Sequence, residues 1–163
     1  MVEAFIKSED CAKCQFCCTF TNDTLWDIPY FDNNLKNKIE KDPKYNNIQF
    51  IPHGNMWKVD MENYYTNNDL TYKCPFLDSI SGCRLKNNKP FICNLWPFIL
   101  IKISGNLAIA LSNNCDIMKQ YNLNELNELL KDDFIKNIYD EGIQHPELVL
   151  DYQKEYIIFN ING

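Results

Sequence analysis

The stretch Cys11-Ala12-Lys13-Cys14-Gln15-Phe16-Cys17-Cys18 lies near the start of this 163-residue chain and decides how the rest is organised. A CxxC pair places two thiolates on either side of one tight turn, where both can bind the same metal at little cost in loop closure. Two overlapping pairs bring Cys11, Cys14 and Cys17 together. Cys18 is harder to place, because neighbouring side chains diverge in extended chain and by about 100° on a helix. If the run were helical, however, all four cysteines would share one stripe.

Four more cysteines lie far downstream and can meet the first four only through the fold; they are Cys74, Cys83, Cys93 and Cys115. Bacterial ferredoxins hold a 4Fe-4S cluster with a CxxCxxC run completed by a distant cysteine that precedes proline, and Cys74-Pro75 has that form. Such ferredoxins carry a second CxxCxxC run, which this chain does not. We interpret all eight cysteines as ligands of one or two 4Fe-4S clusters. Zinc is the alternative, because thiolates alone do not distinguish the two metals.

Disulfide bonds or simple burial would account for the cysteines less well than metal binding does. Structural disulfides would suit a secreted protein, but the first ten residues contain neither a basic segment nor an apolar segment of a signal peptide. Burial as small apolar side chains would account for one or two cysteines and not for the CxxCxxCC run. We therefore expect a cytoplasmic protein with reduced thiols.

Composition predicts one globular domain spanning residues 1–163, since 45% of the residues are hydrophobic and 23% are charged. A formal net charge of −6 without a basic run argues against nucleic acid or an anionic membrane as the main partner. The longest apolar stretch, around residues 98–101, is too short to cross a bilayer. No phosphate-binding loop, dinucleotide fingerprint or Ser/His/Asp arrangement is legible, so hydrolytic or nucleotide-dependent chemistry is unsupported.

Local patterns predict an α+β fold in which a β-hairpin or small antiparallel sheet packs on a few helices. A helix is expected over residues 31–41, capped by Asp32, and two strands around a turn at residues 52–55. Residues 99–103 and 107–111 alternate like a hairpin with a turn at Ser104-Gly105-Asn106, which would carry Cys115 back toward the site.

The end of the chain is expected to form a helical cover over residues 123–163, beyond a motif core at residues 11–115. An amphipathic helix is predicted from Asn124, as its cap, to Gly142, which would end it. The tail over residues 146–159 is compatible with either a helix or a strand.

Three further motifs follow the first run: Cys74-Pro75-Phe76-Leu77, then Gly82-Cys83-Arg84-Leu85, then Lys89-Pro90-Phe91-Ile92-Cys93 with Pro97-Phe98. Together with the CxxCxxCC run, this pattern resembles the YkgJ-like CxxCxxCC cysteine-cluster family, whose domain is described as zinc- or iron-chelating. The resemblance covers residues 11–115, and Lys89 stands where the family often has arginine. Some flagellin lysine N-methylases contain a similar domain and are understood to carry an iron-sulfur cluster there, which favours iron. No methylase activity is carried over, because little of this chain is left for a methyltransferase domain.

Arg84 is the only arginine in the chain, and it follows Cys83 directly. A guanidinium there could pair with a negatively charged cluster or with a bound carboxylate or phosphate. The alternative is chance placement in a lysine-rich composition.

The eight cysteines divide into two predicted groups of four. Cys11, Cys14, Cys17 and Cys74 would hold one centre, and Cys18, Cys83, Cys93 and Cys115 would hold or surround the other. We expect electron transfer, or cluster-dependent redox chemistry, with a redox or substrate protein as partner. A centre with only three cysteines would leave an iron open to substrate and make the protein an enzyme. A zinc-binding structural or interaction module is the non-enzymatic alternative.

Overall fold

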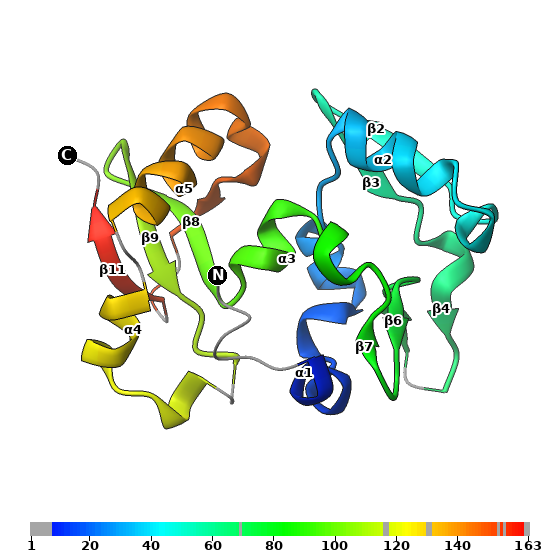
Figure 1. The fold of residues 1–163 in the computed structure, drawn as a ribbon, viewed down its shortest axis with the longest axis horizontal. Helices are drawn as coiled ribbons and strands as arrows, with labels where there is room; N and C mark the ends of the chain where they lie inside the picture. The colour runs from blue at the N-terminus through cyan, green and yellow to red at the C-terminus, as the bar shows by residue number, and fades with distance from the viewer. Residues whose placement is uncertain are drawn as a thin grey trace. The chain divides into compact units, whose positions relative to one another are not determined.

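Short helices and small, mostly antiparallel sheets alternate along the chain, which confirms the predicted α+β class. The structure is a computed structural model, and it describes residues 8–68, 70–115, 118–129, 132–152, 154 and 156–161 (Figure 1). The chain divides into two compact units, one ending at Cys93 and one beginning at Asn94. The single domain expected over residues 1–163 stays a prediction. Seven of the eight cysteines belong to the N-terminal unit, and Cys115 belongs to the other.

The N-terminal unit consists of short elements joined by tight turns. Its helices are α1 (Ser8–Cys14), η2 (Phe16–Cys18), η3 (Asn22–Asp27), α2 (Asn33–Glu40), η4 (Pro43–Tyr45), η5 (Glu62–Tyr64) and η6 (Lys86–Asn88), and α3 (Phe91–Leu95) begins in it. Its strands are β1 (Thr19–Phe20), β2 (Phe50–His53), β3 (Met56–Val59), β4 (Tyr65–Thr66), β5 (Thr71–Lys73), β6 (Leu77–Asp78) and β7 (Gly82–Cys83). They form a three-stranded antiparallel sheet in the order β1-β5-β4 and two hairpins, β2-β3 and β6-β7.

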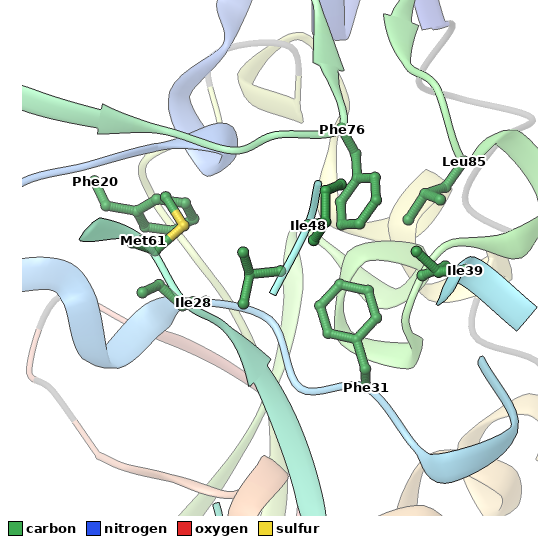
Figure 2. Packing of buried hydrophobic residues seen from close by; sticks show 9 residues of the cluster. Phe20, Ile28, Phe31, Ile39, Ile48, Met61, Phe76 and Leu85 are labelled. Atoms are coloured by element: carbon green, nitrogen blue, oxygen red, sulfur yellow. The ribbon is translucent and has the colours of Figure 1, made fainter. Parts of the chain in front are cut away.

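One hydrophobic core holds these elements together. Figure 2 shows Phe31 and Phe76 pointing toward one another at its centre, with ring centroids 5.7 Å apart. The buried members of the core are Phe20, Ile28, Phe31, Ile39, Ile48, Val59, Met61, Phe76 and Leu85. Cys74 and Cys83 are partly buried and pack against this core. Two of the predicted ligands are thus fixed by apolar packing, independently of any metal.

The predicted helix at residues 31–41 is confirmed as α2, and its predicted cap is confirmed too. The Oδ1 atom of Asp32 accepts a hydrogen bond from the Leu35 N–H at 2.8 Å. The turn predicted at residues 52–55 is wrong in its first half, because Pro52 and His53 continue strand β2. Among the described residues, strand β2 pairs with β3 alone, so it is an edge strand on which the missing N–H of proline is tolerated.

The C-terminal unit is built on a four-stranded sheet in the order β10-β8-β9-β11. Its strands are β8 (Phe98–Ile103), β9 (Asn106–Leu111), β10 (Leu150–Asp151) and β11 (Ile157–Ile161), and its helices are η7 (Met118–Gln120), α4 (Leu123–Leu129), α5 (Asp132–Gln144) and η8 (Pro146–Leu148). The predicted hairpin is confirmed as β8-β9. Ser104 and Gly105 form its turn with positive φ angles of 51° and 92°, as expected of a two-residue hairpin loop. The ambiguous tail contains both a 3-10 turn and two strands.

The single helix predicted over residues 124–142 is wrong at both ends. Asn122, and not Asn124, caps α4: its Oδ1 atom accepts from the N–H groups of Asn124 and Glu125, each at 3.0 Å. Glu125 completes the capping box by accepting from the Asn122 N–H at 2.8 Å. Residues 130 and 131, between α4 and α5, lie outside the described residues.

Gly142 does not end α5, which continues to Gln144. A Cβ atom at position 142 would overlap the Leu100 Cδ2 atom on β8 and would lie 3.4 Å from Val149 Cγ2. The glycine is therefore needed for close packing of α5 on the sheet and not for termination. None of the helices in the described part of the chain is long and apolar enough to span a membrane.

Candidate metal centre

The CxxCxxCC run folds as two short helices separated by a break. Cys11 and Cys14 lie on α1, whose last turn is closed by a hydrogen bond from the Gln15 N–H to the Cys11 carbonyl at 2.9 Å. Gln15 then adopts a left-handed conformation with φ of 53° and donates its side-chain amide to the Ala12 carbonyl at 2.9 Å. Cys17 and Cys18 follow on η2. The run is therefore neither one tight turn nor one helical stripe, because the direction of the chain changes between Cys14 and Cys17.

Strand pairing places Cys18 opposite Cys74. Thr19 and Phe20 of β1 pair with Lys73 and Tyr72 of β5 in antiparallel register. The Cys74 N–H donates to the Cys18 carbonyl at 2.8 Å, so the hydrogen-bonded ladder extends by one pair beyond the strands. Two cysteines 56 positions apart in the sequence are thereby fixed by backbone geometry.

The side chains of this region form a chain of thiols. The Cys17 thiol donates a hydrogen bond to Cys18, and the Cys18 thiol donates to Cys74. Donation to Cys18 raises the pKa of Cys17, and burial raises it further. The pKa of Cys18 is also raised: its hydrogen bond from Cys17 lowers it, but donation to Cys74 and burial outweigh that effect.

Cys83 joins the group from the β6-β7 hairpin. Gly82 precedes it, buried and with a φ of 80°, and helix α1 lies beside β7 (Figure 1). Burial raises the pKa of Cys83, whereas backbone N–H groups of Leu85 and Lys86 that donate to its sulfur lower it. Because N–H groups aimed at sulfur stabilise a thiolate, this turn suits a metal-bound cysteine.

Cys93 is the fifth member, and it reaches the group from α3. Its N–H donates to the Pro90 carbonyl at 3.1 Å. Burial raises the pKa of Cys93, and the neighbouring cysteines 18, 17 and 83 raise it further. We call the set of Cys17, Cys18, Cys74, Cys83 and Cys93 the cysteine cluster.

Three predicted ligands remain, namely Cys11, Cys14 and Cys115. Cys11 and Cys14 lie on α1 beside β7, with Cys14 exposed, whereas Cys115 is buried in the C-terminal unit. All eight cysteines lie in the described ranges and none forms a disulfide, so structural disulfides have no support. Cys17 and Cys18 interact with one another, although the predicted division assigns them to different groups of four. The division itself stays a prediction.

Within the described ranges, no three His, Cys, Asp or Glu side chains already stand in an arrangement that could hold a metal ion. The pKa values of Cys17, Cys18, Cys83 and Cys93 are all raised, which favours the protonated thiols. Metal binding would require these thiols to lose their protons and turn toward a common centre.

The chemistry of the cysteine cluster nevertheless fits a metal. Five neighbouring thiols cannot all ionise unless a cation compensates their charge, and a bound metal does so directly. A donor set made only of sulfur suits zinc or an iron-sulfur cluster. Of the two histidines, His53 lies on β2 with its ring against Tyr30, 5.3 Å between centroids, and His145 belongs to the C-terminal unit.

Arg84 ties together the two loops that carry Cys74 and Cys83. Its guanidinium donates to the Pro75 carbonyl at 2.5 Å, and its backbone N–H donates to the Phe76 carbonyl at 2.8 Å. Its predicted role beside a bound cluster stays a prediction. The charge of Lys89 lowers the pKa of Cys17, Cys83 and Cys93. From the sequence, Lys89 stood out only as a motif position. Its place four residues before a cysteine in a basic-Pro-x-x-Cys motif was the available signal.

Clustered and partly buried thiols, without disulfides, on a small α+β scaffold define a cysteine-rich metal-binding domain. A family model described as "CxxCxxCC: Putative zinc- or iron-chelating domain" matches residues 10–127, and the chain belongs to this family. The match runs from the start of the CxxCxxCC run past Cys115, and so includes every predicted ligand. Neither the curated proteins nor the solved structures gave a significant match.

Proposed function

We propose that this protein is an iron-sulfur protein that holds a 4Fe-4S cluster on its cysteine cluster and exchanges electrons with a protein partner. The observation that carries the proposal is the convergence of five cysteines from η2, the end of β5, β7 and α3. Structural zinc and a 4Fe-4S cluster each take four cysteine ligands, so a donor set made only of sulfur fits both. The resemblance to the domain in some flagellin lysine N-methylases, which is understood to carry an iron-sulfur cluster, favours iron.

The surrounding residues prepare this site in two ways. The N–H groups of Leu85 and Lys86 point at the Cys83 sulfur and stabilise its ionised form. Phe76, which is only 1% exposed, anchors the loop between Cys74 and Cys83 in the hydrophobic core. When bound, a 4Fe-4S cluster supplies one-electron transfer, at a potential set by net charge, hydrogen bonds to sulfur and solvent exposure.

The number of available thiols allows one cluster or two. One cluster would use four of the five thiols in the cysteine cluster. Cys11 and Cys14 on the adjacent α1, together with the thiol left over, are the candidates for a second centre. The acidic net charge of −6 favours a protein partner over nucleic acid or a membrane, in the cytoplasm where thiols stay reduced.

The test is metal and sulfide analysis of protein purified without oxygen. We expect a brown protein with about four iron and four sulfide per chain for one cluster, or about eight of each for two. Replacement of Cys18 by serine should remove at least part of the iron, because Cys18 links Cys17 to Cys74.

The matched control is Phe16→Ala, which changes a half-exposed side chain in the same run and should leave the iron content unchanged. A colourless protein with stoichiometric zinc would overturn the proposal in favour of a zinc-binding module. Unchanged iron in Cys18→Ser would remove Cys18 from the ligand set.

A further inference from the structure

Cys74 begins a tight turn that leads into β6. The Leu77 N–H donates to the Cys74 carbonyl at 3.0 Å, which closes a turn with Pro75 and Phe76 at its centre. Such a turn uses the carbonyl of its first residue, so the carbonyls of its two central residues need partners elsewhere. Pro75 and Phe76 are both buried, which makes an unpaired carbonyl there costly. This segment, residues 74–77, is called the Cys74 turn below, and it depends on donors from outside it.

Arg84 supplies both of these donors. Its backbone N–H donates to the Phe76 carbonyl at 2.8 Å, one position beyond the paired residues of the β6-β7 hairpin. Its guanidinium Nη2 atom donates to the Pro75 carbonyl at 2.5 Å, in a partly buried contact. A single residue, directly after Cys83 in the chain, thus satisfies both central carbonyls of the Cys74 turn.

The backbone of Arg84 is itself held in place. The Tyr45 hydroxyl of η4 donates to the Arg84 carbonyl at 3.3 Å, and the Tyr45 ring packs against that of Phe76 with 5.4 Å between centroids. Leu85, the next residue along the chain, is 5% exposed and belongs to the hydrophobic core. Because the base of the guanidinium side chain is fixed, its hydrogen bond restrains the Cys74 turn.

Two members of the cysteine cluster lie at the ends of this arrangement, since Cys74 begins the turn and Cys83 precedes Arg84. The Cys74 N–H also donates to the Cys18 carbonyl at 2.8 Å, so the turn is joined to a third member. A metal binds more tightly when its ligands are already held near the bound geometry, because binding then has to order fewer groups. The hydrogen bond of the guanidinium contributes to this order on the side of Cys74.

We infer that Arg84 is a positioning residue that holds the Cys74 turn against the β6-β7 hairpin, so that Cys74 and Cys83 keep their relative position and the centre retains its metal more tightly. This role depends on a hydrogen bond and not on the positive charge of the guanidinium. The inference rests on the proposed function only in requiring that the cysteine cluster holds a metal, whichever metal that is.

The experiment compares Arg84→Met, Arg84→Gln and Arg84→Lys with the wild-type protein, all purified without oxygen. Arg84→Met removes both the hydrogen bond and the charge. Arg84→Lys keeps the charge, but its side chain is shorter and ends in a single amine in place of the guanidinium fork. Lys41→Met is the matched control, because it removes one positive charge from an exposed position in the same unit.

Three quantities are measured on each protein. Competition with a chelator gives the retention of the bound metal. The sulfur-to-metal absorption bands, recorded after cobalt substitution if the metal is zinc, report whether the sulfur ligands are displaced. Circular dichroism identifies which variants are folded, and Arg84→Gln provides a second substitution without the guanidinium.

We expect Arg84→Met and Arg84→Gln to lose apparent metal affinity by on the order of 10-fold, the usual effect of removing a group that supports metal ligands. Their absorption bands should shift, because Cys74 is no longer held. Arg84→Lys should lose about as much affinity, since the charge alone does not restore the bond, and Lys41→Met should change neither quantity.

Retention and absorption bands of Arg84→Met equal to those of Lys41→Met would overturn the inference. Full retention in Arg84→Lys together with loss in Arg84→Met would also overturn it, because the charge would then account for the effect. If the metal is zinc, the proposed function fails, but the chelator competition still decides the role of Arg84. A wild-type protein that binds neither iron nor zinc would overturn both.

Discussion

Truncation of Phe76 tests whether the hydrophobic core positions the sulfurs. Phe76 is 1% exposed and lies between Cys74 and Cys83 in the chain, with its ring 5.7 Å from that of Phe31 and 5.4 Å from that of Tyr45. Replacing a buried phenylalanine by alanine costs about 3–5 kcal/mol. Since two aromatic contacts are lost as well, each worth about 0.5–1.5 kcal/mol beyond burial, we expect Phe76→Ala to fall at the upper end of that range.

The assay is urea unfolding of anaerobically purified protein, followed by circular dichroism and by metal release. Phe16→Ala is the control, because Phe16 is 49% exposed and its truncation should cost less than about 1 kcal/mol. Phe76→Ala should also release metal at a lower urea concentration, since Cys74 and Cys83 pack against the same core. Equal destabilisation by the two variants would refute the reasoning, as would full metal retention in a strongly destabilised Phe76→Ala protein.

Two further predictions concern other parts of the chain. Gly142→Ala should destabilise the protein by up to about 2 kcal/mol, because overpacking costs about 1–3 kcal/mol and better helix propensity returns about 1. Thermal unfolding in the Leu100→Ala background checks this. There the added methyl group no longer overlaps Leu100, so Gly142→Ala should stabilise the protein by about 1 kcal/mol, and an unchanged penalty would contradict the explanation. Although Asp27 lies at an exposed position, burial of its carboxyl group raises its pKa from 3.8 to about 6, against the opposing charge of Lys58. The folded protein therefore holds this proton more tightly than the unfolded chain, and the associated stability is lost as the pH rises from about 4 to 6. In urea unfolding, the free energy of unfolding of Asp27→Asn should rise relative to that of the wild-type protein as the pH increases across that window. If the two proteins instead show parallel pH profiles of stability, the pKa of the Asp27 carboxyl group is not raised.

Features set by neighbouring residues could be predicted from the sequence. The Asp32 cap and the β8-β9 hairpin depend on contacts within a few positions, and both are confirmed. Gly82 directly precedes Cys83, and its positive φ is one that glycine adopts without strain. The family was also recognisable, because its motifs consist of cysteine and proline at fixed spacing.

Features set by contacts distant in sequence could not be predicted. The opposition of Cys18 and Cys74 depends on pairing between strands of two and three residues, which are too short to show a periodic pattern. Gly142 looked like a helix terminator, whereas its role depends on Leu100 across the sheet interface. The influence of Lys89 on three cysteines likewise arises only when three separate elements converge.

The most direct measurement of metal binding by the cysteine cluster is X-ray absorption at the iron and zinc edges of the protein purified without oxygen. We predict iron surrounded by sulfur, with a second shell of neighbouring iron atoms at short distance, as sulfide-bridged clusters show. Zinc in a single sulfur shell with no iron signal, or iron bound mainly by nitrogen and oxygen, would contradict the assignment of an iron-sulfur cluster.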